Sequence, residues 1–431
     1  MRKKLALFVV ILLLCISLGG NAYFGSDERN IQKVTDTQSA DDKSPAAADG
    51  TGTQTWPPEM EAQDSATPVT DLPVDAVQSG ETEATAASAA PAPVRGETES
   101  PAPEPWMQTP GEPKPVMIKP LSTDGDDDSP ETVTITISAA GDITLGGDLR
   151  QGANGFMREF YRQESNCSYF LRNVRRVFRK DDLTIANMEG TFASAGPHKG
   201  NEFIISGPPE LVAVFPAGCV DVVTVANNHM MDYLQKGYDE TIAVLEDAGL
   251  EYFGNEYTAL IDVKGVMIGL FGYSMPQAGN DKDKITKTIS RLRDEGADII
   301  IAYYHWGIER DYYPNANQKA IAHHTIDSGA DLVLGSHPHV LQGIEEYKGR
   351  NIVYSLGNFC FGANNNPFDK DTMIYQHTFV FLEGELIESS HHIIPCSISS
   401  VKDRNNYQPT LLEGAEAERV LAKVEQLSSA L

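Results

Sequence analysis

The chain has 431 residues, with 61 acidic and 34 basic side chains and a formal net charge of −27. This length allows one large domain or two ordinary ones. The acidic excess argues against nucleic acid as a partner, because such a surface repels a polyanion.

The N-terminal residues have the pattern of an export signal. Basic residues at 2–4 precede an uncharged apolar run over residues 5–18, and small residues follow at 20–22. This pattern is typical of a cleaved secretory signal peptide. The apolar run can also be extended to Phe24, about the length of a bilayer span. An uncleaved signal-anchor over residues 1–24 is therefore the alternative, and the long segment that follows favours it. Cys15 lacks the small preceding residue of a lipoprotein signal.

Residues 25–130 are rich in Pro, Ala, Thr, Ser and acidic residues, with 21 acidic and 6 basic side chains and a net charge of −15. Such a composition buries too little apolar surface to offset chain entropy, so we expect a disordered linker. Its prolines and like charges favour an extended spacer. The remaining chain is expected outside the cytoplasm, held at the cell membrane by its N-terminus, or secreted if the signal is cleaved.

Residues 131–431 alternate between strand and helix patterns. Apolar and β-branched residues indicate strands near 133–138, 183–186, 220–225, 298–304, 332–334 and 352–356. Helical spacing is found at 169–178, 234–248, 283–295, 318–328 and 411–427. Hairpins are expected over 261–271, and from 375–382 to 387–394. The alternation predicts an α/β domain over residues 131–400, followed by a C-terminal helical tail over 401–431.

The cysteines of this region are Cys167, Cys219, Cys360 and Cys396. They lack CxxC spacing, which argues against a thiolate metal site. Export permits a disulfide, and buried free thiols are the equal alternative.

Polar residues follow the predicted strands, at the edge where α/β domains bind their ligands. These residues are Asp142, Glu189, Asn228, His229, His305, His337, His339 and Asn358. Carboxylates, an amide and three imidazoles suit a borderline divalent ion, and a carboxylate can bridge two ions. Two ions about 3.5–4 Å apart can activate a water molecule and hold a transferring group. Pro338 is expected to fix the turn between the rings of His337 and His339, and Gly335 to let the chain approach the metal.

Each of these residues also has an ordinary structural explanation. Asp142 can form a turn, Asn228 can be a turn residue, and His305 can be a satisfied core histidine. The metal hypothesis therefore depends on their joint placement at strand ends. Histidines without this placement are expected to be structural, namely His198, His323, His324, His391 and His392.

The motifs become specific when they are taken together in chain order. They are Gly141-Asp142, Asn187-Met188-Glu189, Ala226-Asn227-Asn228-His229 with Asp232, His305-Trp306-Gly307-x-Glu309, Gly335-Ser336-His337-Pro338-His339-Val340 and Tyr354-Ser355-Leu356-Gly357-Asn358-Phe359. Over about residues 132–395, this set resembles the CapA-type family of poly-γ-glutamate capsule biosynthesis proteins, within the calcineurin-like metallophosphatase superfamily. That family's membrane-anchoring N-terminus and extracytoplasmic domain also fit.

The resemblance implies an α/β fold, a four-layer α/β/β/α sandwich, with one or two divalent ions (Mn, Zn, Fe or Mg) at the strand ends. By position, it implies that one ion is held by Asp142 and His339, the other by Asn228, His305 and His337, and that Glu189 bridges them.

Further roles follow from the same resemblance. His229 is the implied general acid, or orients the substrate, with Asp232 as its partner. Glu309 is expected to act near the metal as a residue typical of the family, and Asn358 to bind substrate.

One position departs from the superfamily pattern. Its first motif is Asp-x-His, whereas this chain has Asp142-Ile143-Thr144. Without that imidazole one ion has fewer protein ligands, which favours harder ions such as Mn or Mg. Thr144 can face the core instead.

Three functions are compatible with these features. The first is a metal-dependent hydrolase or transferase that acts on poly-γ-glutamate or a related cell-surface polymer. The second is a metal-dependent phosphoesterase acting on an exported ester. The third is a non-catalytic, membrane-tethered component of a polymer synthesis or export complex. The incomplete first motif and the predicted tether favour this function.

Overall fold

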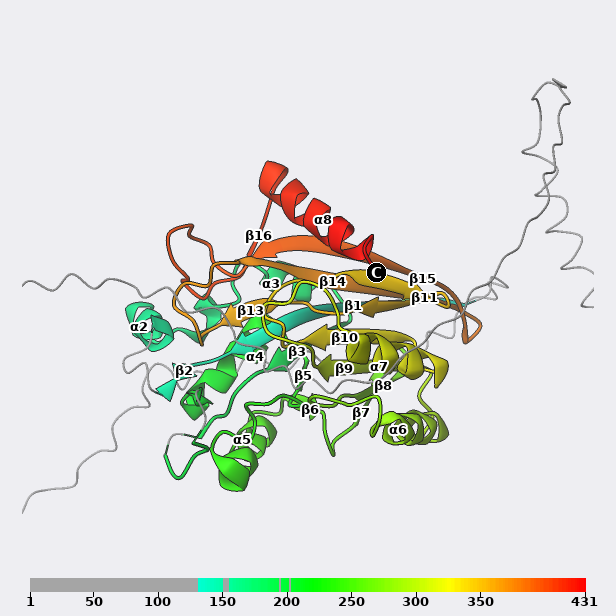
Figure 1. The fold of residues 1–431 in the computed structure, drawn as a ribbon, viewed down its shortest axis with the longest axis horizontal. Coiled ribbons are helices and arrows are strands. Elements are labelled where there is room, and N and C mark those ends of the chain that lie inside the picture. The colour runs from blue at the N-terminus through cyan, green and yellow to red at the C-terminus, as the bar shows by residue number, and fades with distance from the viewer. Residues whose placement is uncertain (1–130, 150–154, 194, 201–202) are drawn as a thin grey trace, which may run out of the picture. The chain divides into compact units, whose positions relative to one another are not determined.

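The computed structural model describes residues 131–149, 155–193, 195–200 and 203–431 (Figure 1). The predicted export signal at 1–24 and the predicted linker at 25–130 lie outside the described residues. Within the described part of the chain, the structure contains no helix with the length and hydropathy needed to cross a membrane.

The first of two large sheets has eight strands in the order β16-β15-β14-β1-β3-β5-β6, with β13 beside the C-terminal end of β1. Strands β1, β3, β5 and β6 are parallel, and β14 and β15 form the predicted late hairpin. The strands are β1 (Thr132–Thr144), β3 (Leu183–Met188), β5 (Val222–Thr224), β6 (Glu251–Phe253), β13 (Asn358–Phe361), β14 (Asp371–Leu382), β15 (Glu385–Ser397) and β16 (Thr410–Leu411).

The second sheet has six strands in the order β11-β12-β10-β9-β8-β7. Its central strands β8, β9, β10 and β12 are parallel, while the edge strands β7 and β11 are antiparallel to their neighbours. The strands are β7 (Ala259–Val263), β8 (Val266–Phe271), β9 (Ile299–His305), β10 (Leu332–Ser336), β11 (Ile344–Tyr347) and β12 (Arg350–Val353). A separate small pair is formed by β2 (Gly147–Asp148) and β4 (Ile205–Ser206).

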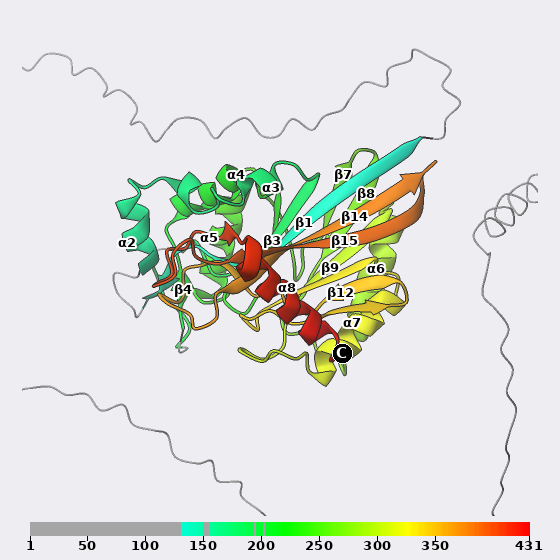
Figure 2. The same cartoon turned by 90° about the horizontal axis from the view of Figure 1, so that it is seen from above.

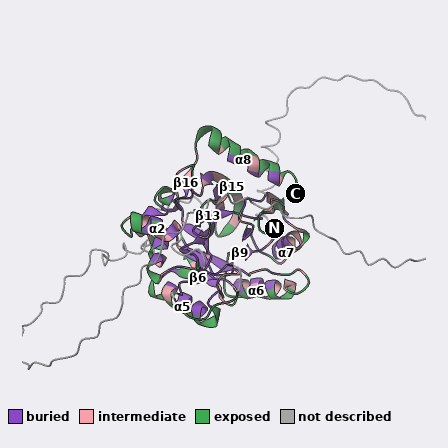
Figure 3. Cartoon of the chain, turned by 60° about the vertical axis from the view of Figure 1, so that its left-hand side comes forward, coloured by how far each residue is buried: buried purple, intermediate pink, exposed green. Residues whose placement is uncertain are grey.

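Helices cover the outer faces of both sheets. The helices of the described residues are α2 (Gly155–Arg162), η3 (Cys167–Tyr169), α3 (Arg175–Phe178), η4 (Pro209–Ala213), α4 (Val214–Gly218), α5 (Leu234–Asp247), α6 (Lys282–Asp294), α7 (Ala316–Asp327) and α8 (Gly414–Ser428). Figure 3 shows exposed residues on α5, α6 and α8 and buried residues on the strands between them.

Alternation along the strands produces three apolar layers. Ile135 and Ile185 of the first sheet face Ile301 and Leu334 of the second, and this cluster fills the space between the sheets. A second cluster lies between the first sheet and helices α2 to α5, and a third between the second sheet and helices α6 and α7. The predicted four-layer α/β/β/α arrangement is therefore confirmed.

The C-terminal helix α8 packs on this domain and crosses over β15 in Figure 2. Its buried residues Val420, Val424 and Leu427 join the apolar layer between the sheets. Next to this buried face, Lys423 forms ion pairs with Asp369, at 2.6 Å, and with Asp371, at 3.0 Å. The helix expected in the C-terminal segment is thus present, and it closes one side of the inter-sheet core.

The one predicted helix that the structure does not form as a unit covers residues 169–178. The chain follows η3, a series of tight turns and then the four-residue α3. Phe170, Leu171, Val174 and Phe178 are nevertheless all buried in the layer beside the first sheet. The apolar spacing correctly predicts a buried face, but burial alone does not require a regular helix.

A close approach at Gly141 fixes the backbone of β1 just before Asp142. A Cβ atom at this position would collide with the carbonyl oxygen of Gly357, so only glycine allows the two segments to meet. The next amide, of Asp142, donates to that same oxygen at 2.9 Å. The irregular register of β1 at Asp142 follows from this contact and fixes the backbone of the carboxylate.

His377 lies on β14 on the same face as Tyr375 and Phe379, which belong to the inter-sheet layer. Its Nδ1 is 3.0 Å from the Tyr375 hydroxyl, and its Nε2 has no hydrogen-bond partner among the described residues. Burial, with the nearby charges of His391 and Arg350, lowers the pKa of His377 to about 3.

We expect His377 to make the folded state sensitive to acid. Its folded pKa lies below its ordinary value, so the unfolded chain takes up the proton first as the pH falls. This stabilising contribution is complete above about pH 6.5 and is lost towards pH 3, with a slope of up to about 1.4 kcal/mol per pH unit. Urea unfolding of the full chain at pH 7, 6 and 5 should show a shallower decline for His377→Phe. His392→Phe, an exposed control on β15, should retain the wild-type slope; equal slopes for all three proteins would refute the assignment.

Candidate metal centre

The predicted polar residues converge at the carboxyl ends of strands from both sheets. Asp142 lies two residues before the end of β1, Glu189 follows β3, and Asn228 lies in the turn after β5. The second sheet contributes the imidazoles, because β9 ends in His305 and β10 is followed by the predicted pair. That pair is His337 and His339.

One group consists of Asp142, Glu189 and His339. The Nδ1 atom of His339 is 3.1 Å from Asp142 Oδ2, and its Nε2 is 3.7 Å from Glu189 Oε1. One potential ligand atom from each residue lies within 4.8 Å of the other two. Both carboxylates are buried, with residue exposures of 0% for Asp142 and 2% for Glu189.

A second group is formed by Asn228, His305 and His337. The Nε2 atom of His305 lies 2.8 Å from Asn228 Oδ1 and 3.1 Å from His337 Nδ1. The three residues predicted to hold the second ion therefore bring one amide oxygen and two imidazole nitrogens close together. These three residues are the ones that the resemblance assigned to the second ion, and that division stays a prediction.

Glu189 lies between the two groups. Its Oε1 is 3.6 Å from His305 Nε2 and 3.7 Å from His339 Nε2, and it has no hydrogen-bond partner among the described residues. Buried carboxylate oxygens are ordinarily paired, so an unpaired one between two imidazoles suits a ligand that bridges two cations. The residues present thus fit one or two divalent ions.

The electrostatics of the first group require positive charge. Burial works to lower the pKa of His339, but the Glu189 charge and the contact with Asp142 outweigh it and raise this pKa to about 10. Burial and the neighbouring Asp142 charge raise the pKa of Glu189 to about 7. For Asp142 burial acts upward, and the hydrogen bond and charge of His339 hold its pKa below the ordinary value.

The imidazoles of the second group have the opposite tendency. Burial lowers the pKa of His305 well below its ordinary value. Burial and the charge of His339 lower the pKa of His337 to about 4. Neutral imidazoles are the form that binds metal, so these two rings are ready ligands at neutral pH.

The loop that holds the two histidines of the second sheet has an unusual backbone. His337 and His339 both have positive φ, 94° and 57°, on either side of Pro338. Such conformations cost of order 1–3 kcal/mol for residues other than glycine and are typical of functional sites. They turn the two rings into the site, with ring centroids 5.7 Å apart.

Two expectations about this region need correction. A Cβ atom on Gly335 would collide with the Tyr354 carbonyl oxygen and the Trp306 indole, so this glycine allows packing against Trp306 and not approach to a metal. Thr144 does not face the core, because its hydroxyl donates to Glu189 Oε2 at 3.2 Å.

Asn358 forms hydrogen bonds with His339. Its Oδ1 is 2.9 Å from His339 Nδ1, its Nδ2 donates to the His339 carbonyl oxygen at 3.1 Å, and the residue is 4% exposed. This geometry favours a role in orienting His339 over the predicted contact with substrate.

His229 and Asp232 form the predicted pair beside the second group. His229 Nδ1 is 2.7 Å from Asp232 Oδ2, which also accepts from the Ile205 amide at 2.7 Å. Burial lowers the pKa of His229, but the hydrogen bond to Asp232 and the Glu189 charge raise it above its ordinary value. The pair leaves His229 Nε2 as the atom that can hold or release a proton.

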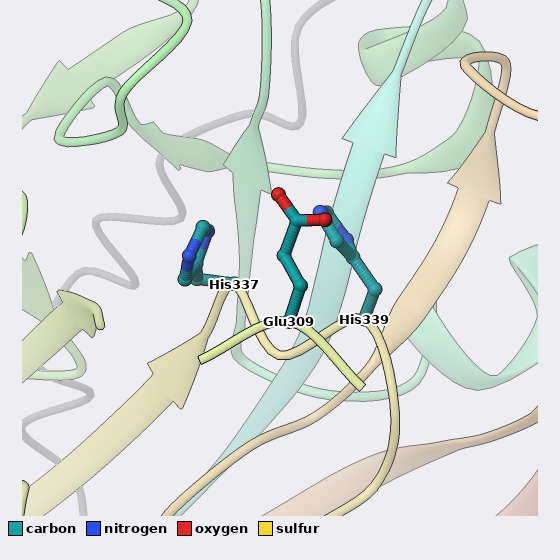
Figure 4. Close-up of side chains that lie close together, drawn as sticks. All are labelled: Glu309, His337 and His339. Carbon is teal, nitrogen blue, oxygen red and sulfur yellow. The ribbon is translucent and has the colours of Figure 1, made fainter. Parts of the chain in front are cut away.

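Glu309 stands on the loop after β9, with its carboxylate directed at the rings of His337 and His339 (Figure 4). One ligand atom from each of these three residues lies within 4.8 Å of the others, and Glu309 itself is exposed. The structure therefore places it at the solvent side of the cluster.

Residues that the sequence did not assign complete the site. Asn187 donates to Asp142 Oδ1 at 2.7 Å, and Asn227 donates to the Met188 carbonyl oxygen at 2.7 Å and to Asn187 Oδ1 at 3.2 Å. Ser336 Oγ is 3.0 Å from His305 Nδ1. All three lie one or two residues before a predicted site residue within a quoted motif, and that proximity was the available signal.

The other histidines that were expected to be structural lie away from this cluster's ligand groups. His323 on α7 pairs with Glu345 at 2.8 Å and stacks on Tyr347, and His324 Nε2 is 2.9 Å from the Thr286 hydroxyl. His391 and His392 lie on β15, as predicted, and His198 is exposed. The four cysteines of the described residues are free thiols.

The geometry of the site agrees with the relationship found by comparison. Residues 136–363 match the family described as "Bacterial capsule synthesis protein PGA_cap". This match covers more than half of the chain and includes every metal ligand proposed above, so the chain belongs to that family.

Individual relatives carry the names expected of this family. The capsule biosynthesis protein CapA of Bacillus anthracis is 30% identical over 274 residues, 57% of this chain and 64% of that protein. The PGA biosynthesis protein CapA of Bacillus subtilis (strain 168) is 31% identical over 239 residues, 50% and 62% respectively. The trifunctional nucleotide phosphoesterase protein YfkN of Bacillus subtilis (strain 168) is 31% identical over 180 residues, 34% of this chain and 12% of that protein. This chain thus spans less than two thirds of the length of the two CapA relatives.

Removing one buried ligand should weaken metal binding. In Asp142→Asn the shape is kept but the charge between His339 and Asn187 is lost, and we expect Mn²⁺ affinity at that site to fall at least about tenfold. Full-length protein stripped with EDTA and dialysed against Mn²⁺ or Zn²⁺ is to be assayed for metal content and for the rise in Tm on metal addition. Asp403→Asn is the matched control, because the Asp403 side chain is 80% exposed. Wild-type metal content in Asp142→Asn would disprove the assignment.

Proposed function

We propose that the chain is a metal-dependent hydrolase or transferase that acts on poly-γ-glutamate or a related cell-surface polymer during its biosynthesis. Membership of the bacterial capsule synthesis family and the names of the CapA relatives support the substrate class. The observation that carries the catalytic part is Glu189 Oε1, buried and unpaired between His305 and His339.

A divalent ion bound by these residues would supply Lewis acidity, activating water and polarising the oxygen of the group that is attacked. The protein's own part is to present its donors in fixed positions. Asn187 and Asn358 hold Asp142 and His339 through hydrogen bonds of 2.7 and 2.9 Å, so the donors need little reorganisation.

His229 is the residue proposed to move a proton. Asp232 fixes Nδ1, and its negative charge favours the protonated ring. A proton on Nε2 can then pass to the departing nitrogen when an amide bond breaks, leaving a neutral imidazole paired with Asp232. This is general acid catalysis, and it serves an ester leaving group in the same way.

The location and partners belong to the same proposal. The basic and apolar N-terminus supports a membrane anchor or export signal over residues 1–24, and the acidic composition of 25–130 supports a spacer that lets the domain reach polymer outside the cell. A membrane-bound polymer synthase is the partner that such a tether would serve. The net charge of −27 speaks against nucleic acid.

Site variants should separate catalysis from scaffolding. In cells lacking the native gene, Asp142→Asn and His337→Ala are each expected to lower polymer yield or change polymer length by at least about tenfold, since each removes a ligand. Export and folding are to be checked by surface labelling and thermal unfolding, with Asp403→Asn as control. If both variants support normal polymer while deletion of residues 1–130 abolishes it, the chain is instead a non-catalytic tethered component.

A phosphoesterase activity is the second candidate, and the similarity to a nucleotide phosphoesterase over 180 residues favours it. It predicts that the wild-type protein with Mn²⁺, Zn²⁺ or Fe²⁺ hydrolyses simple phosphomonoesters or phosphodiesters and that Asp142→Asn does not. Release of nitrophenol from nitrophenyl phosphates is the direct measurement. No release above the Asp142→Asn background, from protein shown to contain metal, would eliminate this candidate.

A further inference from the structure

Glu309 has no structural task that accounts for its position. Its side chain is exposed, and no hydrogen bond or ion pair of it is found among the described residues. Its carboxylate nevertheless lies beside the rings of His337 and His339, with one ligand atom of each residue within 4.8 Å of the others (Figure 4).

The loop that bears Glu309 is held in place by several contacts. The amide of Arg310, which has a positive φ of 64°, donates to the Pro338 carbonyl oxygen at 2.7 Å. The Asp311 carbonyl oxygen accepts from Gln342 Nε2 at 2.8 Å, and the Tyr312 hydroxyl donates to Asp369 at 2.7 Å. The backbone at Glu309 is therefore registered against the loop of the two histidines, and the approach of its carboxylate is built into the fold.

The first metal group has room for another protein donor. Asp142, Glu189 and His339 are its three residues, and Thr144 stands where the superfamily has an imidazole. The Thr144 hydroxyl already donates to Glu189. Divalent ions such as Zn²⁺ and Mg²⁺ usually take four to six donors.

We propose that Glu309 is a metal ligand that completes, from the solvent side, the ion held by Asp142 and His339. This assignment rests on the proposed metal centre. An added carboxylate in place of an imidazole makes the donor set harder, so Glu309 also biases the site towards Mn²⁺ over Zn²⁺. Glu309 then acts on the reaction through the ion and not as an acid or base.

Three variants of the full-length protein test this assignment. Glu309→Gln keeps the shape and removes the charge, Glu309→His exchanges carboxylate for imidazole, and Glu385→Gln removes an exposed carboxylate from β15. Metal-stripped protein is titrated with Mn²⁺ and with Zn²⁺ by calorimetry, and bound metal is counted after dialysis. Thermal unfolding in EDTA should be the same for all of them, because Glu309 is exposed and unpaired in the described structure.

We expect Glu309→Gln to weaken Mn²⁺ binding at one site by at least about tenfold, because loss of a ligand should cost no less than loss of an outer-shell partner. Glu309→His should recover Zn²⁺ binding and shift the Zn²⁺-to-Mn²⁺ affinity ratio at least about tenfold towards Zn²⁺. Glu385→Gln should bind both metals as the wild type does.

The outcomes distinguish this inference from the proposal beneath it. If Glu309→Gln binds Mn²⁺ like the wild type while Asp142→Asn does not, Glu309 is no ligand and the metal centre stands. If catalysis falls in Glu309→Gln with both metal affinities unchanged, Glu309 acts on substrate and the ligand assignment is wrong. If the wild-type protein binds neither metal, both the centre and the role of Glu309 are refuted.

Discussion

Two carboxylates buried side by side, Asp142 and Glu189, impose the constraint on which the site depends. Burial of one unpaired anion costs several kcal/mol, and a second anion nearby adds repulsion. Imidazole groups lie beside these carboxylates. His339 contacts both of them, and His305 Nε2 lies 3.6 Å from Glu189 Oε1. A divalent ion satisfies the same electrostatic requirement with more charge and with directed bonds. The cluster therefore requires positive charge, from a protonated His339 or from a bound cation.

The two-sheet architecture explains how these charges are brought together. The first sheet supplies the carboxylates at the ends of β1 and β3, and the second supplies imidazoles at the ends of β9 and β10. Neither sheet supplies all the site residues, so the site depends on how the two sheets are placed against each other. The Tyr303 hydroxyl of β9 donates to the Ala140 carbonyl oxygen of β1 at 3.0 Å, two residues before His305 and Asp142 respectively. The apolar layer between the sheets, to which residues of α8 contribute, also holds the sheets together.

How much the sequence predicted depended on whether the signal was local. Asp142 and Glu189 could be grouped because parallel strands end at one edge of a sheet, whereas His305 lies in the second sheet and its approach to them depends on contacts between the sheets. The long periodic helices α5, α6 and α7 were predictable from the spacing of their apolar residues. The three-residue strand β6 and the short helix α4 offered too few residues for a periodic pattern. The hydrogen bond of Asn358 to His339 could not be foreseen, because the two residues are distant in the chain. The close packing of Gly335 against Trp306 is a tertiary contact that the sequence does not reveal. The domain limits and the residues before 131 stay predictions.

Thr144 stands where the resemblance implies a histidine, and the sequence alone did not suggest that it holds Glu189 in place. Its hydroxyl holds Glu189 Oε2 at 3.2 Å, and this leaves Oε1 facing His305 Nε2 and His339 Nε2. An imidazole at position 144 would offer a nitrogen ligand, whereas the threonine hydroxyl orients the Glu189 carboxylate through its hydrogen bond. Glutamate, one methylene longer than aspartate, has more rotamers to restrain and gains more from such a hydrogen bond. The pairing of Glu189 with Thr144 is therefore self-consistent, because the threonine hydroxyl restrains the longer carboxylate.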